Sequence, residues 1–303
     1  MPRDKPDRCH ALFSEEALQA TRSGFRSREF GVEIRPEIFN GVTPDLASWN
    51  VQKSFSRKHR EVSSRQSGQE SYGFIAIIVR ILNHGPINLS VPNRLQRLGV
   101  SKIDLVTIHD ITEPMLGKDW RQQLEIAKKG AMPELTRMRE EGIIGSWGMG
   151  VNNLETCLEA MEAANPDIML QATRYNLLDH KEALAKLFPK ARANDVALII
   201  GAPLGAGYLA GTDRWLYGGD VPAGFADKRA RMDKIANKHG TDLRTAALQF
   251  TTAPDIVAAT IPGARNAEQA RANHASMTQA IPAAFWQDMK QQGLIAEDAP
   301  TPG

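Results

Sequence analysis

The sequence predicts an α/β fold, a (β/α)8 or TIM barrel that is incomplete or irregular in its first three strand-helix units. Two observations predict it. From about residue 95 onward, five short apolar runs alternate with patterns typical of amphipathic helices. Polar or glycine-rich segments follow the ends of these runs. Such alternation indicates a parallel sheet with right-handed crossovers, and in a barrel the carboxyl ends of the strands carry the catalytic side chains.

The five apolar runs are rich in Val, Ile and Leu, as expected for strands that are buried on both faces. They predict strands over 105–109, 143–149, 168–171, 196–200 and 256–261.

Helices are predicted after each strand from the spacing of apolar residues and from helix-ending signals. The first ends at Gly142, the second begins after Asn153 as N-cap, and the third is bent at Pro189. Besides the helix after Asn153, which places Leu154, Cys157, Leu158 and Met161 on one face, the predicted helices span about 120–141, 181–193, 227–239, 243–252, 267–277 and 282–292.

Residues 1–94 form an atypical N-terminal region. Only 74–82 is a convincing strand there and 30–34 is a weaker one, although a full barrel would need three strand-helix units. We therefore divide the chain into a possibly degenerate first part of the barrel (1–94), the C-terminal part of the barrel (95–295) and a flexible tail (296–303).

Composition excludes several classes of protein. The 303 residues carry a net charge of +2 without a Lys/Arg-rich run, so no nucleic-acid partner is expected. The longest apolar run, 74–79, is too short to cross a membrane, and the N-terminus lacks the apolar segment of a signal peptide. Cys9 and Cys157 lie far apart without metal-ligand spacing, which favours a reduced cytoplasmic chain and no metal site.

His109 is the candidate catalytic residue. It ends the strand 105–109 and precedes Asp110, so a titratable group lies at the tip of a central strand. A core histidine bonded to a backbone carbonyl is about equally compatible with the pattern.

Three further segments could bind a ligand at the same rim. The loop 201–211 contains Gly205 and Gly207, whose bare N–H groups could cradle a phosphate, although such a loop taken alone is more often a simple turn. Arg265 follows the last strand, where a phosphate site recurs in barrels. Asn152 and Gln171 are polar groups at successive strand ends.

Several spaced motifs occur together in one order. They are Leu95-Gln-Arg-Leu-Gly-Val-Ser-Lys-Ile-Asp-Leu-Val-Thr-Ile-His-Asp110, Gly148-Met-Gly-Val-Asn152, Gly201-Ala-Pro-Leu-Gly205, Ile261-Pro-Gly-Ala-Arg265 and Asn273. Over about 95–295 the chain thereby resembles the aldo-keto reductase superfamily, nearest the branch of aldose 1-dehydrogenases, L-fucose dehydrogenase and pyridoxal 4-dehydrogenase.

The resemblance implies a barrel that binds a nicotinamide dinucleotide and transfers a hydride to or from a sugar, alcohol or aldehyde. His109 would hydrogen-bond the substrate carbonyl or hydroxyl. Asn152 and Gln171 would hold the nicotinamide carboxamide. The segment with Pro203, Leu204, Gly205 and Gly207 would bind the pyrophosphate, and Gly263, Arg265, Gln269 and Asn273 would bind the adenosine phosphate end.

The resemblance also bears on the choice of cofactor. NADP-selective members place a lysine and an arginine where this chain has Gly263 and Gln269, so a 2′-phosphate would lose charge-assisted bonds. NAD is therefore favoured, while Arg265 and Arg271 could still compensate for NADP. The aromatic residue that many members stack on the nicotinamide is Gly201 here.

The chain departs from the family in its proton-transfer group. The family uses Asp, Tyr and Lys beside the histidine, and the motifs that carry them are missing from the N-terminal third. Two alternatives to an active aldose dehydrogenase follow: a catalytically impaired dinucleotide-binding barrel, or the product of a frameshifted gene. The sequence carries no signal for oligomeric state.

Overall fold

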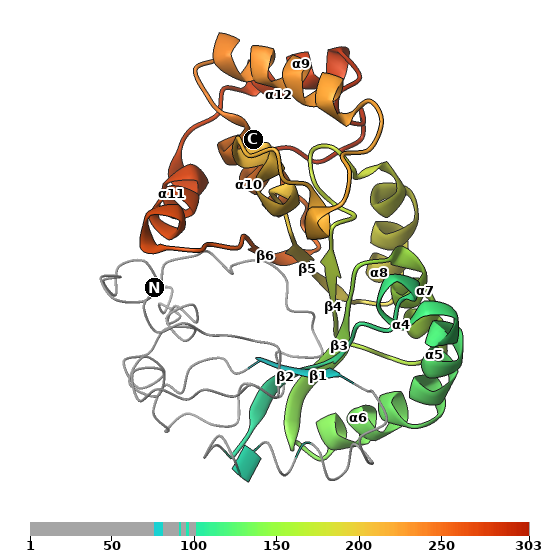
Figure 1. The fold of residues 1–303 in the computed structure, drawn as a ribbon. Coiled ribbons are helices and arrows are strands. Elements are labelled where there is room, and N and C mark those ends of the chain that lie inside the picture. Colours follow the sequence, from blue (N-terminus) through green and yellow to red (C-terminus); the bar gives the residue numbers. More distant parts are fainter. Residues whose placement is uncertain (1–75, 81–90, 92–94, 97–100, 303) are drawn as a thin grey trace, which may run out of the picture.

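The computed structural model describes residues 76–80, 91, 95–96 and 101–302, and these form a six-stranded parallel sheet (Figure 1). Its strand order, β1-β2-β3-β4-β5-β6, is the order of the sequence. The strands are β1 (Ala76–Arg80), β2 (Ile103–His109), β3 (Ile144–Val151), β4 (Ile168–Ala172), β5 (Ala197–Gly201) and β6 (Val257–Ile261). All five strands predicted after residue 95 are confirmed. The predicted strand 74–82 contains β1, whereas 30–34 lies outside the described residues.

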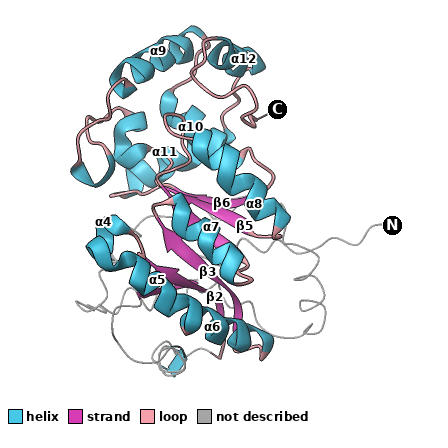
Figure 2. Cartoon of the chain, turned by 90° about the vertical axis from the view of Figure 1, so that its right-hand side faces the viewer, coloured by secondary structure: helices cyan, strands magenta, loops and turns pink. Residues whose placement is uncertain are grey.

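Helices follow the strands along the chain, and α5, α6, α7 and α8 cover one face of the sheet (Figure 2). The α-helices that the structure describes are α4 (Glu113–Leu116), α5 (Trp120–Lys129), α6 (Ala131–Glu140), α7 (Leu154–Ala163), α8 (Phe188–Ala193), α9 (Phe225–Lys238), α10 (Leu243–Thr252), α11 (Ala267–Thr278) and α12 (Ala283–Gln291). Shorter helical turns are η4 (Gly117–Asp119), η5 (Ala183–Leu187), η6 (Gly205–Ala210) and η7 (Leu216–Gly218).

The two faces of the sheet bury different residues, as alternation along strands requires. One face joins the helices in a large core that includes Trp147, Phe188 and Phe250. The other face holds a small cluster centred on Leu105, with Ile168 and Ile199 from neighbouring strands. We call them the helix face and the inner face of the sheet.

One predicted helix differs from the prediction, for a backbone reason. The span 120–141 is two helices, α5 and α6, because the chain turns at Gly130. Pro133 lies in the first turn of α6, where its missing N–H is tolerated, but it could not continue α5. The predicted helix 181–193 is helical throughout and contains the π-helical turn η5 directly before α8, in whose first turn Pro189 lies.

The predicted flexible tail, 296–303, is packed at its start. Ala299 is buried, and the backbone N–H of Ala296 donates to Nε2 of His180 over 3.1 Å. Since Nε2 accepts this bond, Nδ1 of His180 carries the proton and donates to the carbonyl of Asn176 over 3.0 Å. The neutral imidazole therefore joins the C-terminal segment to the loop after β4.

Acid should weaken this junction. Burial, with a further contribution from the nearby cation of Lys228, lowers the pKa of His180 from 6.5 to about 4. The unfolded chain therefore binds a proton between these values that the folded chain does not, so the stability contribution is complete above pH ~6.5 and falls as the pH drops toward 4. We expect His180 to account for roughly 3 kcal/mol across that window.

Urea unfolding of the wild type and of His180→Asn at several pH values measures this contribution. Carboxylates also titrate in acid, so the difference in pH slope between the two proteins isolates His180. Equal slopes would contradict the assignment.

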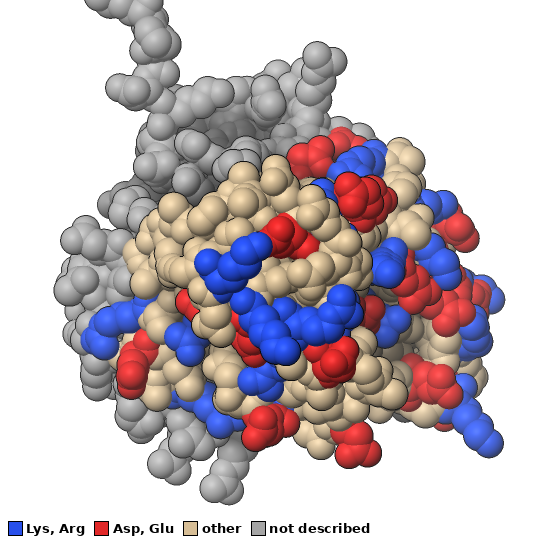
Figure 3. All heavy atoms as spheres, turned by 90° about the horizontal axis from the view of Figure 1, so that it is seen from above, with Lys and Arg blue, Asp and Glu red and all other residues tan. Residues whose placement is uncertain are grey.

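The surface of the described part shows mixed charge. On the face seen in Figure 3, Lys and Arg side chains lie among Asp and Glu side chains. Ion pairs among the described residues include Lys238 with Asp288 at 2.7 Å. Such a mixture gives no large field of one sign on this face. Among the described helices, none has the length and apolar character needed to span a membrane.

Candidate functional site at the carboxyl ends of the strands

His109 ends β2 on the inner face of the sheet. Its parallel register aligns it with Gly150 of β3, Leu170 of β4 and Ile199 of β5, and Leu170 and Ile199 belong to the inner-face cluster. The imidazole is about one-quarter exposed. The structure therefore places a titratable, accessible ring at the strand ends, where the sequence predicted it.

Asp110 fixes the orientation of that ring. Oδ1 of Asp110 lies 2.9 Å from Nδ1 of His109. Asp110 has a positive φ of 62°, and its N–H donates to the carbonyl of Gly150 over 3.0 Å. With Nδ1 engaged, Nε2 is the nitrogen of His109 that remains to meet a substrate, and the carboxylate stabilises the ring when it carries a proton.

The ring of His109 rests directly on Gly150. A Cβ atom at position 150 would lie 2.4 Å from Cδ2 and 3.0 Å from Nε2 of His109. Any side chain at position 150 would overlap the imidazole of His109, so only glycine is compatible with the observed ring position.

Gly150→Ala is therefore expected to move the His109 ring without unfolding the protein, because a side chain can give way where backbone cannot. We expect kcat/KM to fall at least about tenfold, while the melting temperature changes by only a few degrees. Steady-state kinetics and thermal unfolding of the same variant measure both. In a His109→Ala background, Gly150→Ala should not lower kcat/KM further. If it lowers kcat/KM there as much as it does in the wild type, Gly150 does not act through the His109 ring.

Asn152 follows β3 at the same rim and carries a polar atom without a partner. Its Oδ1 is buried and has no hydrogen-bond partner among the described residues, and the same holds for Oδ1 of Asn153. Nδ2 of Asn152 donates to the hydroxyl of Tyr217, over 3.5 Å. A buried acceptor without a donor is costly in a folded protein, so Asn152 is suited to receive an N–H from a ligand.

Gln171 does not lie beside His109. In the register Gln171 aligns with Val151 and Ile200, both of which belong to the helix-face core. Its Nε2 donates to the carbonyl oxygens of Ala172, at 2.9 Å, and Val151, at 3.4 Å, and its Oε1 accepts from Cys157. One step along the strand decides which face a side chain meets, so Gln171 lies on the helix face of the sheet, behind the strand end.

The glycine-rich loop after β5 forms a compact helical turn, η6. The N–H of Gly205 donates to the carbonyl of Ala202, and that of Gly207 donates to the carbonyl of Leu204, each over 3.0 Å. The two N–H groups expected to cradle a phosphate are thus engaged within the loop, while Pro203 and Leu204 are buried. Both glycines have positive φ, and a Cβ at 205 would lie 2.7 Å from the ring of Trp215.

The segment after β6 caps α11. Oδ1 of Asn266 accepts the N–H of Gln269, over 2.9 Å, and Oε1 of Gln269 accepts the N–H of Arg265, over 2.8 Å. Asn273 is buried and its Nδ2 donates to the carbonyl of Gly263 over 3.5 Å. The predicted residues are therefore brought together in space, with Arg265 and Gln269 exposed.

Sequence reasoning missed Gly150 and Tyr217. Gly150 had a signal: Gly148 and Gly150 are two apart in one strand, so both face inward. Tyr217 had none, because nothing in a long polar loop tells which residue reaches another strand.

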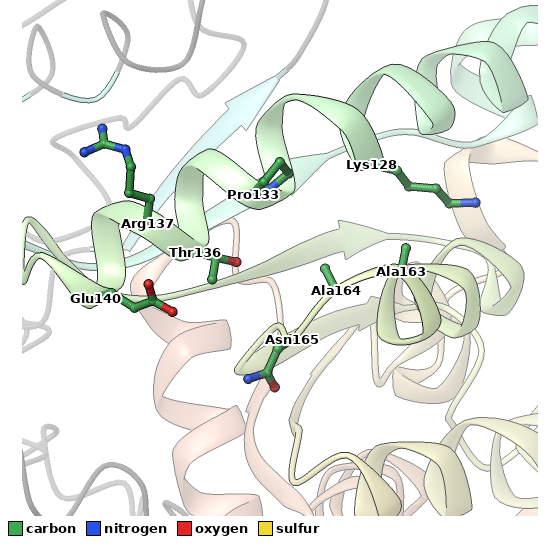
Figure 4. Close-up of a pocket in the computed structure, with 8 residues that line it drawn as sticks. All are labelled: Lys128, Pro133, Thr136, Arg137, Glu140, Ala163, Ala164 and Asn165. Atoms are coloured by element: carbon green, nitrogen blue, oxygen red, sulfur yellow. The ribbon is translucent and has the colours of Figure 1, made fainter.

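A shallow pocket lies at the opposite end of the sheet (Figure 4). It has a volume of about 300 Å³ between α6 and the end of α7, beside the chain that enters β4. Both of its cations are paired, since Lys128 contacts Glu159 and Arg137 contacts Glu134. His109 ends its strand at the other edge, so this pocket is not part of the candidate site. The described residues contain no cluster of His, Cys, Asp and Glu that could hold a metal ion.

Comparison with known proteins gives one family. A sequence model of the Aldo/keto reductase family matches residues 83–293. The chain is 32% identical over 209 residues to pyridoxal 4-dehydrogenase from Microbacterium luteolum, which covers 66% of the chain and 60% of that protein. It is 28% identical over 221 residues to D-threo-aldose 1-dehydrogenase from a Pseudomonas species, and the matched region covers 71% of this chain and 63% of that protein. The chain thus spans about three-fifths of the length of these relatives.

Solved structures agree on the fold. An aldo-keto reductase from Bacillus halodurans in its holo form superposes with a TM-score of 0.56 at 19% identity, covering 77% of this chain and 76% of that one. An aldo/keto reductase from Klebsiella pneumoniae in complex with NADP and acetate gives 0.50 at 14% identity, covering 76% and 71%. Together with the parallel strands in sequence order, this confirms the predicted (β/α)8 architecture.

Proposed function

Because the chain belongs to the aldo/keto reductase family, we propose that it is a nicotinamide-dependent oxidoreductase that oxidises the C1 hydroxyl of an aldose or reduces the matching carbonyl. The observation that carries the proposal is the pair of His109 and Asp110 at the tip of β2. The names of the two curated relatives support a sugar or aldehyde as substrate. The proposal includes a cytoplasmic location, on the grounds of cysteine usage.

His109 can orient and deprotonate a hydroxyl in this site. Asp110 accepts from Nδ1–H, so Nε2 of the neutral ring has its lone pair directed away from Asp110. A substrate hydroxyl can donate to this nitrogen, and the carboxylate stabilises the imidazolium that forms when the proton moves. In the reverse direction the same Nε2–H donates to a carbonyl oxygen.

The residues at the rim fit a nicotinamide dinucleotide. The carboxamide of that cofactor offers an N–H group to Oδ1 of Asn152, which has no donor within the described part of the chain. Pro203, Leu204, Gly205 and Gly207 would line its pyrophosphate, and Gly263, Arg265, Gln269 and Asn273 its adenosine end. Gln171 would steady the carbonyl of Val151 beside Asn152. The cofactor, when bound, supplies the carbon that accepts or gives the hydride.

We propose NAD as the preferred cofactor because Gly263 offers no charge to a 2′-phosphate. A side chain at 263 would meet nothing within 4 Å and its φ is not in the left-handed region, so Gly263→Lys should fold normally. The added ammonium is expected to strengthen NADP binding relative to NAD by about tenfold through a charge-assisted contact. Binding titrations of both cofactors measure the ratio, with Gly263→Met as the uncharged control. An unchanged ratio would place the adenosine phosphate elsewhere.

A second candidate is a barrel that binds the dinucleotide without turning over a substrate. The observation that favours it is the lack of the family's Asp, Tyr and Lys motifs in the sequence. A broad panel of sugars and aldehydes, including L-fucose and D-arabinose, with NAD and NADP distinguishes the two. Formation of reduced cofactor supports the enzyme. Quenching of tryptophan emission by NADH without turnover supports the binder, and neither response would refute both.

A further inference from the structure

Lys228 is a partly buried cation without a carboxylate partner. It lies in the first turn of α9, and its Nζ donates to the carbonyl oxygen of Leu178 over 2.8 Å. With the residues that the structure describes, Lys228 forms no ion pair. A charge that is drawn out of water without a counter-ion is costly, and the dipole of a helix disfavours a cation in its first turn. The ammonium form of Lys228 is therefore poorly stabilised, while the side chain stays in reach of solvent.

The charged groups around Lys228 do not restore the balance. Burial, followed by repulsion from Lys181, lowers the pKa of Lys228 from 10.5 to about 8, although Asp179 acts in the opposite direction. Asp179 is engaged by Arg174 at 3.3 Å, and the neighbouring His180 stays neutral because its own pKa is lowered. A substantial fraction of the Lys228 amine is thus uncharged near neutral pH, and an uncharged lysine amine is a nucleophile.

The hydrogen bond to Leu178 favours one kind of product on this amine. An amide nitrogen keeps one N–H, so an acylated Lys228 can still donate to the buried Leu178 at its carbonyl oxygen. A neutral imine has no N–H and would leave that oxygen without this donor. Acylation also removes the positive charge and with it the repulsion from Lys181. The surroundings of Lys228 therefore suit an acyl group.

The proposed function supplies an acyl donor at the same side of the sheet. Oxidation at C1 of a ring-form aldose converts the hemiacetal carbon into the carbonyl of a lactone, which is an internal ester. The segment with Leu178 follows the carboxyl end of β4, and α9 follows the chain that leaves the carboxyl end of β5. In a parallel sheet these ends lie on the side where β2 ends in His109. An aldonolactone released there is a small, uncharged acyl donor.

We propose that Lys228 is a modification site whose amine is acylated by an aldonolactone. Nζ attacks the lactone carbonyl carbon, a C1–N bond forms, and the bond between C1 and the ring oxygen breaks. The proton that the nitrogen loses ends on that oxygen as a hydroxyl. No group leaves and nothing is oxidised or reduced, so the protein gains the mass of one whole lactone. The choice of donor rests on the proposed function, whereas the reactivity of the amine does not.

Fresh D-gluconolactone, followed by peptide mass mapping, tests the site without any turnover. Lys118, an exposed lysine in η4, is the internal reference. Near neutral pH we expect Lys228 to be acylated about tenfold faster than Lys118, because its larger uncharged fraction outweighs the weaker nucleophilicity of a less basic amine. The rate at Lys228 should level off above a pH of about 8. Lys228→Arg keeps a cation and a donor for Leu178, and the rapid adduct should disappear from its intact mass.

Lys181→Gln tests the electrostatic cause. Removing this neighbouring cation should raise the pKa of Lys228, so less of the amine is uncharged and acylation near neutral pH should slow by about threefold. Lys186→Gln removes a charge of the same sign from η5 and should leave the rate at Lys228 unchanged. Both side chains are exposed, so the fold should tolerate either change.

The inference is overturned if Lys228 is acylated no faster than Lys118, or if Lys181→Gln reacts at the wild-type rate. Neither result depends on the proposed function, since the lactone is added ready-made. Incubation with NAD and the aldose panel is the second arm. Reduced cofactor together with acylated Lys228 supports both proposals. Acylation by added D-gluconolactone, with neither reduced cofactor nor adduct from any aldose, would overturn the proposed oxidation alone.

Discussion

His109→Asn is expected to lower kcat/KM by about a thousandfold, equivalent to about 4 kcal/mol of transition-state stabilisation. The imidazole is the group at the tip of β2 that can exchange a proton with the substrate, and asparagine keeps some polarity without a titratable nitrogen. The ring is about one-quarter exposed, so the fold should tolerate the change. Steady-state kinetics with the best substrate and cofactor, beside a thermal melt of the same sample, measure the effect.

Asp110→Asn is the matched control for His109. Asparagine accepts the positive φ of residue 110 and can still bond Nδ1, but it removes the charge that stabilises the imidazolium. A loss of about tenfold is expected, concentrated in kcat. A His109→Asn enzyme with wild-type kcat/KM would remove His109 from the chemistry, and the proposed function would then need another proton donor.

Gly148→Ala should have the largest effect on stability. A Cβ at this position would lie 1.6 Å from the carbonyl oxygen of Ile168, a backbone atom of the neighbouring strand. Relief requires β3 and β4 to separate, which breaks the pairing of Gly148 with Ile168 in the middle of the sheet. The cost should exceed the usual range for overpacking and reach about 4 kcal/mol.

Urea unfolding of Gly148→Ala measures that cost directly. Gly263→Ala is the control, because a Cβ there meets nothing within 4 Å, and its free energy of unfolding should stay within about 0.5 kcal/mol of the wild type. If Gly148→Ala fails to fold, its absence from the soluble fraction beside normal Gly263→Ala agrees with the expectation. A Gly148→Ala protein as stable as the control would contradict the close approach of the strands.

The sequence predicted the strands well because buried parallel strands are continuous apolar runs. It predicted helix ends less well, because a single run such as 120–141 does not reveal that Pro133 begins a new helix. The packing of the C-terminal segment could not be predicted for a different reason. Its polar residues resemble a tail, and only the distant His180 explains why Ala296 is bound.

Within the site, order along the chain predicted which residues gather at the rim but not which face each side chain meets. His109 and Asn152 lie at the strand ends as expected. Gln171 is turned by one step to the helix face, and Gly205 and Gly207 use their N–H groups internally. The contact of Tyr217 with Asn152 joins residues 65 positions apart through a loop without periodicity, so no local pattern could have predicted it.

The identity of strand order and sequence order has a consequence for how the protein is made. Each strand from β2 to β6 pairs with the strand synthesised just before it, so every new pairing closes only the loop back to the preceding strand. The entropy cost of closing a loop grows with its length, and domains synthesised from the N-terminus can fold as the chain emerges. The sheet can therefore grow by one strand at a time on the ribosome, with β3 and its two inward glycines already docked before the loop of Tyr217 is translated.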